Sequence, residues 1–142
     1  MYFPEQLIDT GINAPKEHQR IISKLTTGLG VLYYREKRIA LEPLPETMID
    51  EGQTSPVPDI QLYDNEKLNT PIIIEVAHAN GARNDFKKVE RLIEEYEYGI
   101  LEGFVYNYTT GEWLKYSKGQ GPVEEQPFWS DVLGLDLAAL LA

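Results

Sequence analysis

The chain has 142 residues, a formal net charge of −10 and no cysteine. This length predicts one domain over 1–142, with residues 1–13 as an N-terminal arm. The lack of cysteine excludes disulfides, thiolate catalysis and cysteine-ligated zinc. The acidic balance argues against loose, purely electrostatic binding to nucleic acid, but it is compatible with a nuclease whose acidic site works through metal ions.

The sequence contains no apolar run long enough to span a bilayer. It also lacks a basic N-terminal segment followed by an apolar one, which is the pattern of a signal peptide. We therefore expect no membrane association and a cytoplasmic location, which agrees with the lack of cysteine.

The first half of the chain is expected to form one helix, a hairpin and a long loop. Apolar residues recur at helical spacing through 16–29, and glycines offer stop signals at the end of this pattern. Two short runs, 31–35 and 38–42, predict a β-hairpin around the charged residues between them. Four prolines within 43–58 predict a long loop, and loops of that length are often functional.

The second half alternates strands with a helix. Runs rich in β-branched and aromatic residues predict four strands, at 59–63, 72–77, 103–108 and 113–116. Between the middle two, apolar residues at helical spacing predict a helix capped by Asn84 and closed by Gly99. Residues 129–142 predict a terminal amphipathic helix or two short turns. This order of elements predicts an α/β fold, a mixed β-sheet flanked by α-helices.

Two carboxylates lie inside segments that otherwise predict strands. Asp59 begins the first, and Glu75 interrupts a run of five apolar residues. An acid in so apolar a strand is costly to bury unless a cation meets it, so Glu75 favours a functional site over a satisfied structural acid. For Asp59 alone, an ordinary acid at a strand start is the stronger interpretation. Such oxygen ligands suit a hard cation like Mg²⁺, which could activate water next to a phosphate.

The helix that follows Glu75 offers a positive charge. At about 100° per residue, Lys88 lies at the border of the apolar face of this helix, whereas Lys87 points to solvent. Asp85 falls on the adjoining face, in the turn nearest the end of the Glu75 strand. Lys88 is therefore the better candidate to position water or phosphate. An ordinary flanking lysine and a helix-start acid explain the same residues about equally well.

Other polar residues are weaker candidates. His78 follows Glu75 by three residues and could contact phosphate or water, although a loop histidine is more often structural. Glu17 could face a metal if the first helix packs across the site. The sequence indicates only a surface or packing role for His18.

An aromatic cluster lies in the C-terminal half of the chain. It consists of Tyr106, Tyr108, Trp113 and Tyr116. Base stacking is one interpretation. Because no basic residues are interleaved with these rings, cross-strand packing or an oligomer contact is the stronger prediction.

The order of motifs resembles the Uma two family of restriction endonucleases, within the PD-(D/E)xK nuclease superfamily. The resemblance rests on Glu17-His18-Gln19-Arg20-Ile21, Pro58-Asp59, the Ile-Ile-Ile-Glu75-Val76 run, Asp85 with a lysine in the next helix, the Gly99 to Phe104 segment and Gly134-Leu135-Asp136-Leu137. These motifs cover most of the chain, from residue 16 to its end.

The resemblance implies a restriction-endonuclease-like core and hydrolysis of DNA phosphodiester bonds. It implies Asp59 and Glu75 as ligands of Mg²⁺ or Mn²⁺, and Val76, next to Glu75, is counted in the same metal site. Together with the residues above, the expected catalytic set is Asp59, Glu75, Lys88, Asp85, Glu17 and His78. DNA is then the expected partner, and a homodimer is expected by analogy because two cuts in a duplex need two sites.

One departure from the superfamily pattern keeps a second function open. The lysine that usually follows the glutamate by two residues is Ala77 here, so a lysine from the next helix, Lys88, would have to replace it. The alternative is a catalytically inactive nuclease-fold protein that acts as a dimerising or partner-binding module. Ala77 and the acidic charge favour this alternative. Convergence of Asp59, Glu75 and Lys88 on one point would favour the enzyme.

Overall fold

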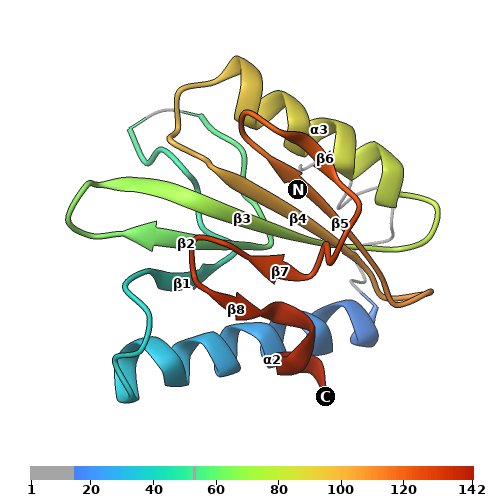
Figure 1. Ribbon diagram of the computed structural model, residues 1–142, viewed down its shortest axis with the longest axis horizontal. Coiled ribbons are helices and arrows are strands. Elements are labelled where there is room, and N and C mark those ends of the chain that lie inside the picture. Colours follow the sequence, from blue (N-terminus) through green and yellow to red (C-terminus); the bar gives the residue numbers. More distant parts are fainter. Residues whose placement is uncertain (1–14, 53) are drawn as a thin grey trace.

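The computed structural model describes residues 15–52 and 54–142 and shows an α/β fold, as predicted (Figure 1). The predicted arm 1–13 lies outside the described residues. In the described part of the chain, one sheet has the spatial order β1 (Glu42–Pro45), β2 (Ile60–Asp64), β3 (Asn69–Ala77), β4 (Glu102–Asn107), β5 (Glu112–Ser117) and β6 (Gly121–Val123). The β3–β4 pair is parallel and the other neighbours are antiparallel, so the sheet is mixed.

The central strand β3 is buried on both faces. Ile72 and Ile74 pack in the cluster that includes α2 (Lys16–Gly30), whereas Ile73 and Ala77 pack in the cluster that includes α3 (Ala82–Glu95). Figure 1 shows these two helices on opposite sides of the sheet. A strand that is covered on both faces needs apolar residues at every position, which explains the near-continuous apolar run.

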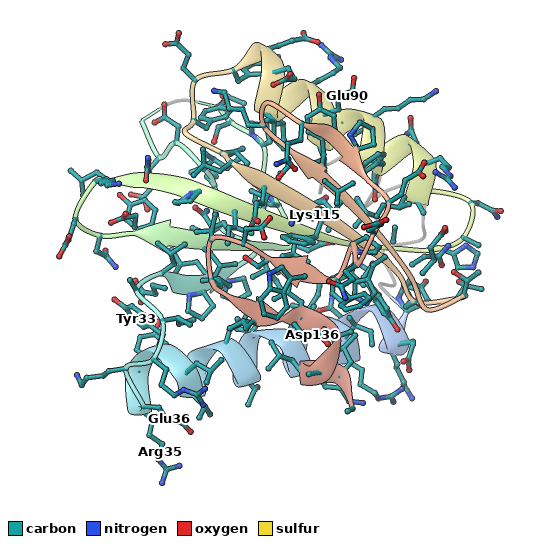
Figure 2. All side chains as sticks on the ribbon, in the orientation of Figure 1. Tyr33, Arg35, Glu36, Glu90, Lys115 and Asp136 are labelled. Carbon is teal, nitrogen blue, oxygen red and sulfur yellow. The ribbon has the colours of Figure 1, made fainter. Side chains whose placement is uncertain are left out.

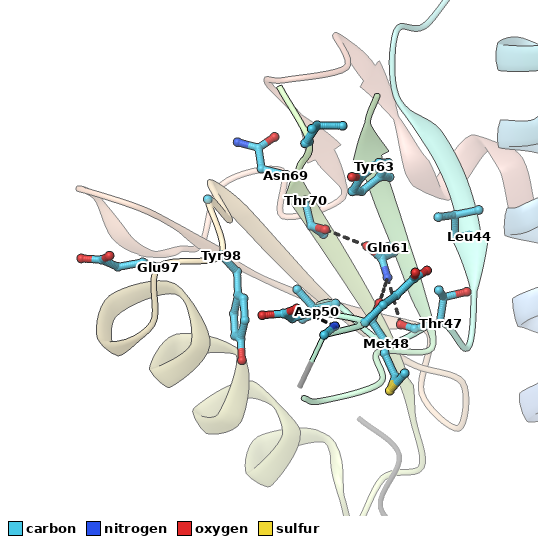
Figure 3. A pocket seen from close by; sticks show the side chains of 15 residues that line it. Leu44, Thr47, Met48, Asp50, Gln61, Tyr63, Asn69, Thr70, Glu97 and Tyr98 are labelled. Carbon is cyan, nitrogen blue, oxygen red and sulfur yellow. Dashed lines mark hydrogen bonds between the residues drawn. The ribbon is translucent and has the colours of Figure 1, made fainter. Parts of the chain in front are cut away.

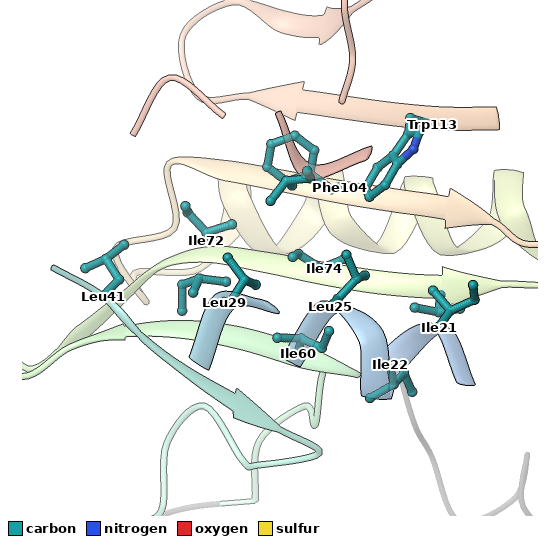
Figure 4. Packing of buried hydrophobic residues seen from close by; sticks show 13 residues of the cluster. Ile21, Ile22, Leu25, Leu29, Leu41, Ile60, Ile72, Ile74, Phe104 and Trp113 are labelled. Carbon is teal, nitrogen blue, oxygen red and sulfur yellow. The ribbon is translucent and has the colours of Figure 1, made fainter. Parts of the chain in front are cut away.

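Helix α2 covers its face of the sheet with a regular stripe of large aliphatic side chains. Ile21, Ile22, Leu25 and Leu29 are buried and face the sheet (Figure 4). Their spacing of three and four residues places them on one side of the helix. This packing fixes the direction of α2 and carries its first turn to the edge of the sheet where β3 ends.

Helix α3 packs closely on β4 because a glycine makes room for it. A Cβ atom at Gly103 would lie 2.1 Å from Cγ1 of Val89 and 3.2 Å from Cδ1 of Ile93. Val89 and Ile93 are both buried. The close approach sets the position of α3, and therefore of the polar residues in its first turns.

The predicted β-hairpin over 31–42 is wrong. Helix α2 runs directly into a π-helical segment, η1 (Val31–Arg35), and the first strand begins only at Glu42. Gly30 keeps helical backbone angles (φ −63°, ψ −41°) and so does not stop the helix. The amide of Glu36 bonds the carbonyl of Val31 at 2.9 Å, so continued helical pairing satisfies the backbone despite the β-branched and aromatic side chains.

The boundaries of α3 also differ from the prediction. Gly81, not Asn84, is the N-cap residue, and the helix ends at Glu95, before Gly99. Gly99 has φ +81°, and a Cβ atom there would lie 2.7 Å from Nδ2 of Asn69. This glycine therefore shapes the loop that enters β4.

Of the two alternatives predicted for 129–142, the amphipathic helix is wrong. The segment instead forms a small antiparallel pair, β7 (Trp129–Ser130) with β8 (Leu135–Asp136), followed by a 3-10 helix, η2 (Leu137–Leu141). The Asp136 side chain accepts hydrogen bonds from the amides of Ala138 and Ala139 and so caps η2. Within the described residues, no helix has the length and apolar character to cross a bilayer.

A buried ion pair that no sequence pattern revealed holds this C-terminal segment on the sheet. Lys115 and Glu102 are each only 2% exposed, and their Nζ and Oε2 atoms are 3.3 Å apart. Nζ also donates to the carbonyl of Trp129 at 2.7 Å, and Glu102 accepts from Oγ of Ser130 at 2.7 Å. Figure 2 places Lys115 within the body of the fold, whereas Arg35 and Glu36 project at the far end of α2.

Candidate functional site

The candidate site lies at the edge of the sheet where the parallel strands β3 and β4 end. The first turns of α2 and α3 point to this same edge (Figure 1). The amide of Tyr108 bonds the carbonyl of Ala77 at 3.0 Å, which joins the two chain segments as they leave the sheet. In α/β folds, the carboxyl ends of parallel strands are the usual place for ligands.

Asp59 and Glu75 meet at this edge. The amide of Asp59 donates to Oε1 of Glu75 at 3.0 Å, and the amide of Val76 donates to Oδ2 of Asp59 at 2.7 Å. Asp59 is 3% exposed and Glu75 is fully buried. Alternation along β3 places the Glu75 side chain on the α3 face of the sheet, between Ile73 and Ala77. Two residues that are far apart in the sequence thus form a pair of neighbouring buried carboxylates.

His18 contacts this pair from the first turn of α2. Its Nε2 atom is 3.5 Å from Oδ2 of Asp59. Burial raises the pKa of Asp59, but the contact with His18 and the amide of Val76 outweigh it, and the pKa falls below 3.8. Burial likewise lowers the pKa of His18, but Asp59 outweighs it and the pKa rises above 6.5. The histidine therefore keeps Asp59 ionised, which is more than a surface or packing role.

Helical spacing in the sequence indicates that His18 lies on the buried face of α2 and needs a polar partner. It precedes Ile21, Ile22 and Leu25 by three, four and seven residues, so it lies on the buried stripe of α2. A polar side chain on a buried stripe needs a polar partner, and here that partner is Asp59.

Asp85 connects α3 to the same site. Burial raises its pKa above 3.8, the positive charge of Lys88 lowers it, and the negative charge of Asp59 raises it further. Asp85 therefore lies close enough to feel both charges. Lys88 follows Asp85 by one helical turn and is half-buried. This placement agrees with the position at the border of the apolar face that helical spacing predicted.

Glu17 and His78 lie around Tyr108, at the α2 side of the same edge. Glu17 forms an ion pair with Arg20 and helps raise the pKa of Tyr108, after the larger effect of burial. His78 is exposed, and the centre of its ring is 5.7 Å from that of Tyr108. Its Nδ1 atom accepts a hydrogen bond from the amide of Asn80 at 3.3 Å.

The oxygen donors at this edge suit one kind of metal ion. Two neighbouring carboxylates match Mg²⁺, which typically takes one or two protein carboxylates and completes its shell with water and substrate oxygens. They do not provide the nitrogen and sulfur ligands of a structural zinc site. Across 15–52 and 54–142, no three histidine, aspartate or glutamate side chains gather in a cage for a metal. The site thus fits an ion held largely by water and substrate.

A separate cavity of about 610 Å³ lies between the loop after β1 and the segment after α3 (Figure 3). Gln61 forms part of its wall and is held by the carbonyls of Thr47 and Met48 and by the hydroxyl of Thr70. The charged residues in its lining are all acidic, namely Asp50, Glu51 and Glu97. Because these carboxylates repel phosphate, this cavity is unsuited to a nucleic acid backbone.

Comparison with known proteins identifies the fold. No protein-family model matches this chain, and no curated protein matches its sequence. The chain is similar to a solved structure of a protein from Anabaena variabilis that is described as a "putative nuclease belonging to DUF820". The TM-score is 0.67, the match covers 91% of this chain and 84% of that chain, and the identity is 15%. At this identity the likeness concerns the fold, and this chain has a nuclease-like α/β fold.

Proposed function

We propose that this protein is a metal-dependent endonuclease that hydrolyses phosphodiester bonds in DNA, as a member of the Uma two family in the PD-(D/E)xK superfamily. The observation that carries the proposal lies at the carboxyl end of the parallel strands: Glu75 accepts a hydrogen bond from the amide of Asp59, and Asp59 accepts one from the amide of Val76, the residue after Glu75. The nuclease-like fold and the description of the similar Anabaena variabilis protein support it.

The carboxylates of Asp59 and Glu75 would hold Mg²⁺ or Mn²⁺, with Val76 in the same site. When bound, such an ion lowers the pKa of a water ligand and neutralises charge that develops on the phosphoryl group. The backbone amide of Val76 and the imidazole of His18 orient Asp59 and keep it ionised. These contacts prepare the ligand geometry before substrate arrives.

The first turns of α3 would serve the reacting groups. Lys88 would steady the phosphate or the attacking water through its positive charge. Asp85, whose pKa is raised by burial, is better suited than an ordinary aspartate to accept a proton from that water. Glu17 and His78 are secondary members of the expected catalytic set, and they lie on the α2 side of the site.

Calorimetry with Mg²⁺ and with Mn²⁺ tests the metal site. We expect binding by the wild type in the millimolar range and loss of binding in Glu75→Gln, a variant of nearly unchanged shape. Glu95→Gln is the control because Glu95 is an exposed glutamate at the end of α3. Binding that survives in Glu75→Gln, or that is lost equally in Glu95→Gln, would contradict this ligand assignment.

Cleavage assays test the reaction. Wild-type protein and Glu75→Gln are incubated with single-stranded and duplex DNA, with Mg²⁺, with Mn²⁺ and with a chelator. We expect cleavage by the wild type alone, and only when metal is present. Wild-type cleavage that continues in the chelator would contradict metal dependence.

A partner-binding module without catalysis is the second candidate function. It is favoured by Ala77 at the usual lysine position and by the net charge of −10. If the wild type binds no metal at millimolar concentration, with or without DNA, this function replaces the first. Sedimentation would then measure self-association, which a dimerising module requires.

A further inference from the structure

Tyr108 lies between two histidines at the edge of the candidate site. The centre of its ring is 6.2 Å from that of His18 and 5.7 Å from that of His78, and both contacts are edge-to-face. The hydrogen bond from the amide of Tyr108 to the carbonyl of Ala77 fixes the backbone at 3.0 Å. Tyr108 is half-buried and His78 is exposed, so solvent reaches this group of rings.

The other aromatic residues of this region have packing roles inside the fold. Tyr106 contacts Trp113 across the β4–β5 pair, with ring centres 4.8 Å apart, and Tyr116 contacts Phe86 of α3 at 6.2 Å. The stronger prediction of cross-strand packing thus holds for Tyr106 and Trp113. Tyr108 differs because it follows the last paired residue of β4, Asn107, and has no partner in the β4–β5 register.

His18 links this aromatic group to the carboxylates. Its ring contacts Tyr108, and its Nε2 atom is 3.5 Å from Oδ2 of Asp59. A ligand whose phosphate reaches Asp59 and Glu75 therefore has its neighbouring sugar and base within range of Tyr108. An aromatic ring holds a base by stacking against its face. A base is free to stack in this way only after it has left the stack of a duplex.

The charges around the site disfavour binding through the phosphate backbone. The chain carries a net charge of −10, and two nearby arginines are matched by acids, Arg20 by Glu17 and Arg83 by Glu112. Duplex binding depends strongly on the neutralisation of many phosphates. Binding of single strands depends less on such neutralisation than binding of duplex does, and base stacking on aromatic rings adds to it.

We propose, on the basis of the proposed nuclease function, that Tyr108 and His78 form a stacking platform for an unpaired base of the substrate. The substrate class is then single-stranded DNA, or DNA with unpaired bases at the cleavage point, rather than intact duplex. Tyr108 and His78 position the nucleotide next to the scissile phosphate. They take no part in the bond changes.

Binding measured without turnover tests the platform. The wild-type protein is titrated, with Ca²⁺ in place of Mg²⁺, with a single-stranded oligonucleotide that carries a fluorescent base analogue, and with the duplex of the same sequence. Tyr108→Leu removes the ring but keeps an apolar side chain against the core, Tyr108→Phe keeps the ring, and His78→Ala changes an exposed residue. Tyr96→Ala is the control, because Tyr96 is an exposed tyrosine that stacks on Tyr98 beyond the end of α3.

We expect the single strand to bind more tightly than the duplex and to quench the base analogue. Tyr108→Leu should weaken single-strand binding by about 5- to 100-fold, which is the effect of losing one stacked base. Tyr108→Phe and Tyr96→Ala should leave binding unchanged, and His78→Ala should weaken it less than Tyr108→Leu. Equal or tighter duplex binding, no single-strand binding, or unchanged binding in both Tyr108→Leu and His78→Ala would overturn the platform.

The two proposals fail in different ways. Metal-dependent cleavage of duplex and single strand at equal rates, unaffected by Tyr108→Leu, would overturn the platform and leave the nuclease intact. Single-strand binding that depends on Tyr108, without any cleavage by the wild type, would overturn the nuclease and leave the platform as a binding site.

Discussion

The backbone amide of Val76 donates a hydrogen bond to the side chain of Asp59 and so fixes this carboxylate before any ligand arrives. The Val76 amide donates to Oδ2 of Asp59 at 2.7 Å, while the Asp59 amide donates to Oε1 of Glu75, the residue before Val76, at 3.0 Å. These bonds tie the start of β2 to the end of β3. Both acids are at most 3% exposed, so the alignment resists solvent competition.

The His18–Asp59 contact should make stability depend on pH with a defined sign. Because the folded pKa of His18 lies above 6.5, its contribution is complete below 6.5 and is lost as pH rises through the folded pKa. Because the folded pKa of Asp59 lies below 3.8, its contribution is present above 3.8 and is lost as pH falls through the folded pKa. His18→Gln should therefore lower the free energy of unfolding most between these limits.

Urea denaturation of wild type and His18→Gln at several pH values measures this difference. We expect a loss on the order of 1 kcal/mol in mildly acidic solution, shrinking in alkaline solution. His78→Gln is the control, since His78 is exposed and its Nδ1 atom bonds a backbone amide. A difference between wild type and His18→Gln that is constant with pH would contradict the ionic contact.

Replacement of Lys88 should affect catalysis while replacement of its neighbour should not. Lys88→Gln removes a charge that reaches Asp85, and we expect kcat for DNA cleavage to fall by about 100-fold. Lys87→Gln is the matched control because Lys87 is exposed on the same helix. Equal kcat values for the two variants would show that the lysine of α3 does not serve the reaction.

Gly103→Ala should destabilise the protein by displacing α3. The added Cβ atom would lie 2.1 Å from Cγ1 of Val89, so the helix must shift, at a cost of about 1–3 kcal/mol. Combining Gly103→Ala with Val89→Ala removes the colliding atom. Urea denaturation of both single variants and the double variant measures the free energy of unfolding. The double variant should lose less of it than the two single variants lose together. Additive losses would mean that the collision is not the cause.

Lys115→Met should be among the more destabilising single substitutions because it leaves Glu102 buried without its cation. We expect a loss of about 3–5 kcal/mol in the free energy of unfolding, with partial recovery when Glu102→Gln is added. Arg91→Met, which breaks an exposed ion pair with Glu95 in α3, should lose about 0.5 kcal/mol or less. Similar losses for Lys115→Met and Arg91→Met would contradict a structural role for the buried pair.

Local patterns predicted the fold class and the burial of the strand that carries Glu75. The apolar stripe over 16–29 and the buried run of β3 appear in the structure as predicted, because a side chain's periodicity reports which faces of its own element are buried. The isolated acid in that run led to the prediction that a cation meets Glu75, and the structure shows Glu75 accepting a hydrogen bond from the amide of Asp59. The same reasoning placed Lys88 at the border of a helix face.

Side-chain periodicity predicted the wrong element where the backbone can form its hydrogen bonds either as a helix or as a strand. Residues 31–35 have β-branched and aromatic side chains, yet they continue the helix because Gly30 adopts helical angles. The C-terminal segment 129–142 forms strands and a 3-10 helix because Lys115 and Glu102 bind its backbone and side chains from the sheet.

The sequence by itself therefore determined the buried faces of α2, α3 and β3, because each face follows the period of its own element. Only the tertiary structure decided which buried polar groups meet. Contacts such as His18 with Asp59 and Lys115 with Glu102 join different elements, and the number of residues between the partners follows no helix or strand period. A buried polar side chain shows that it needs a partner but does not identify one, since the partner is set by how the helices and strands pack.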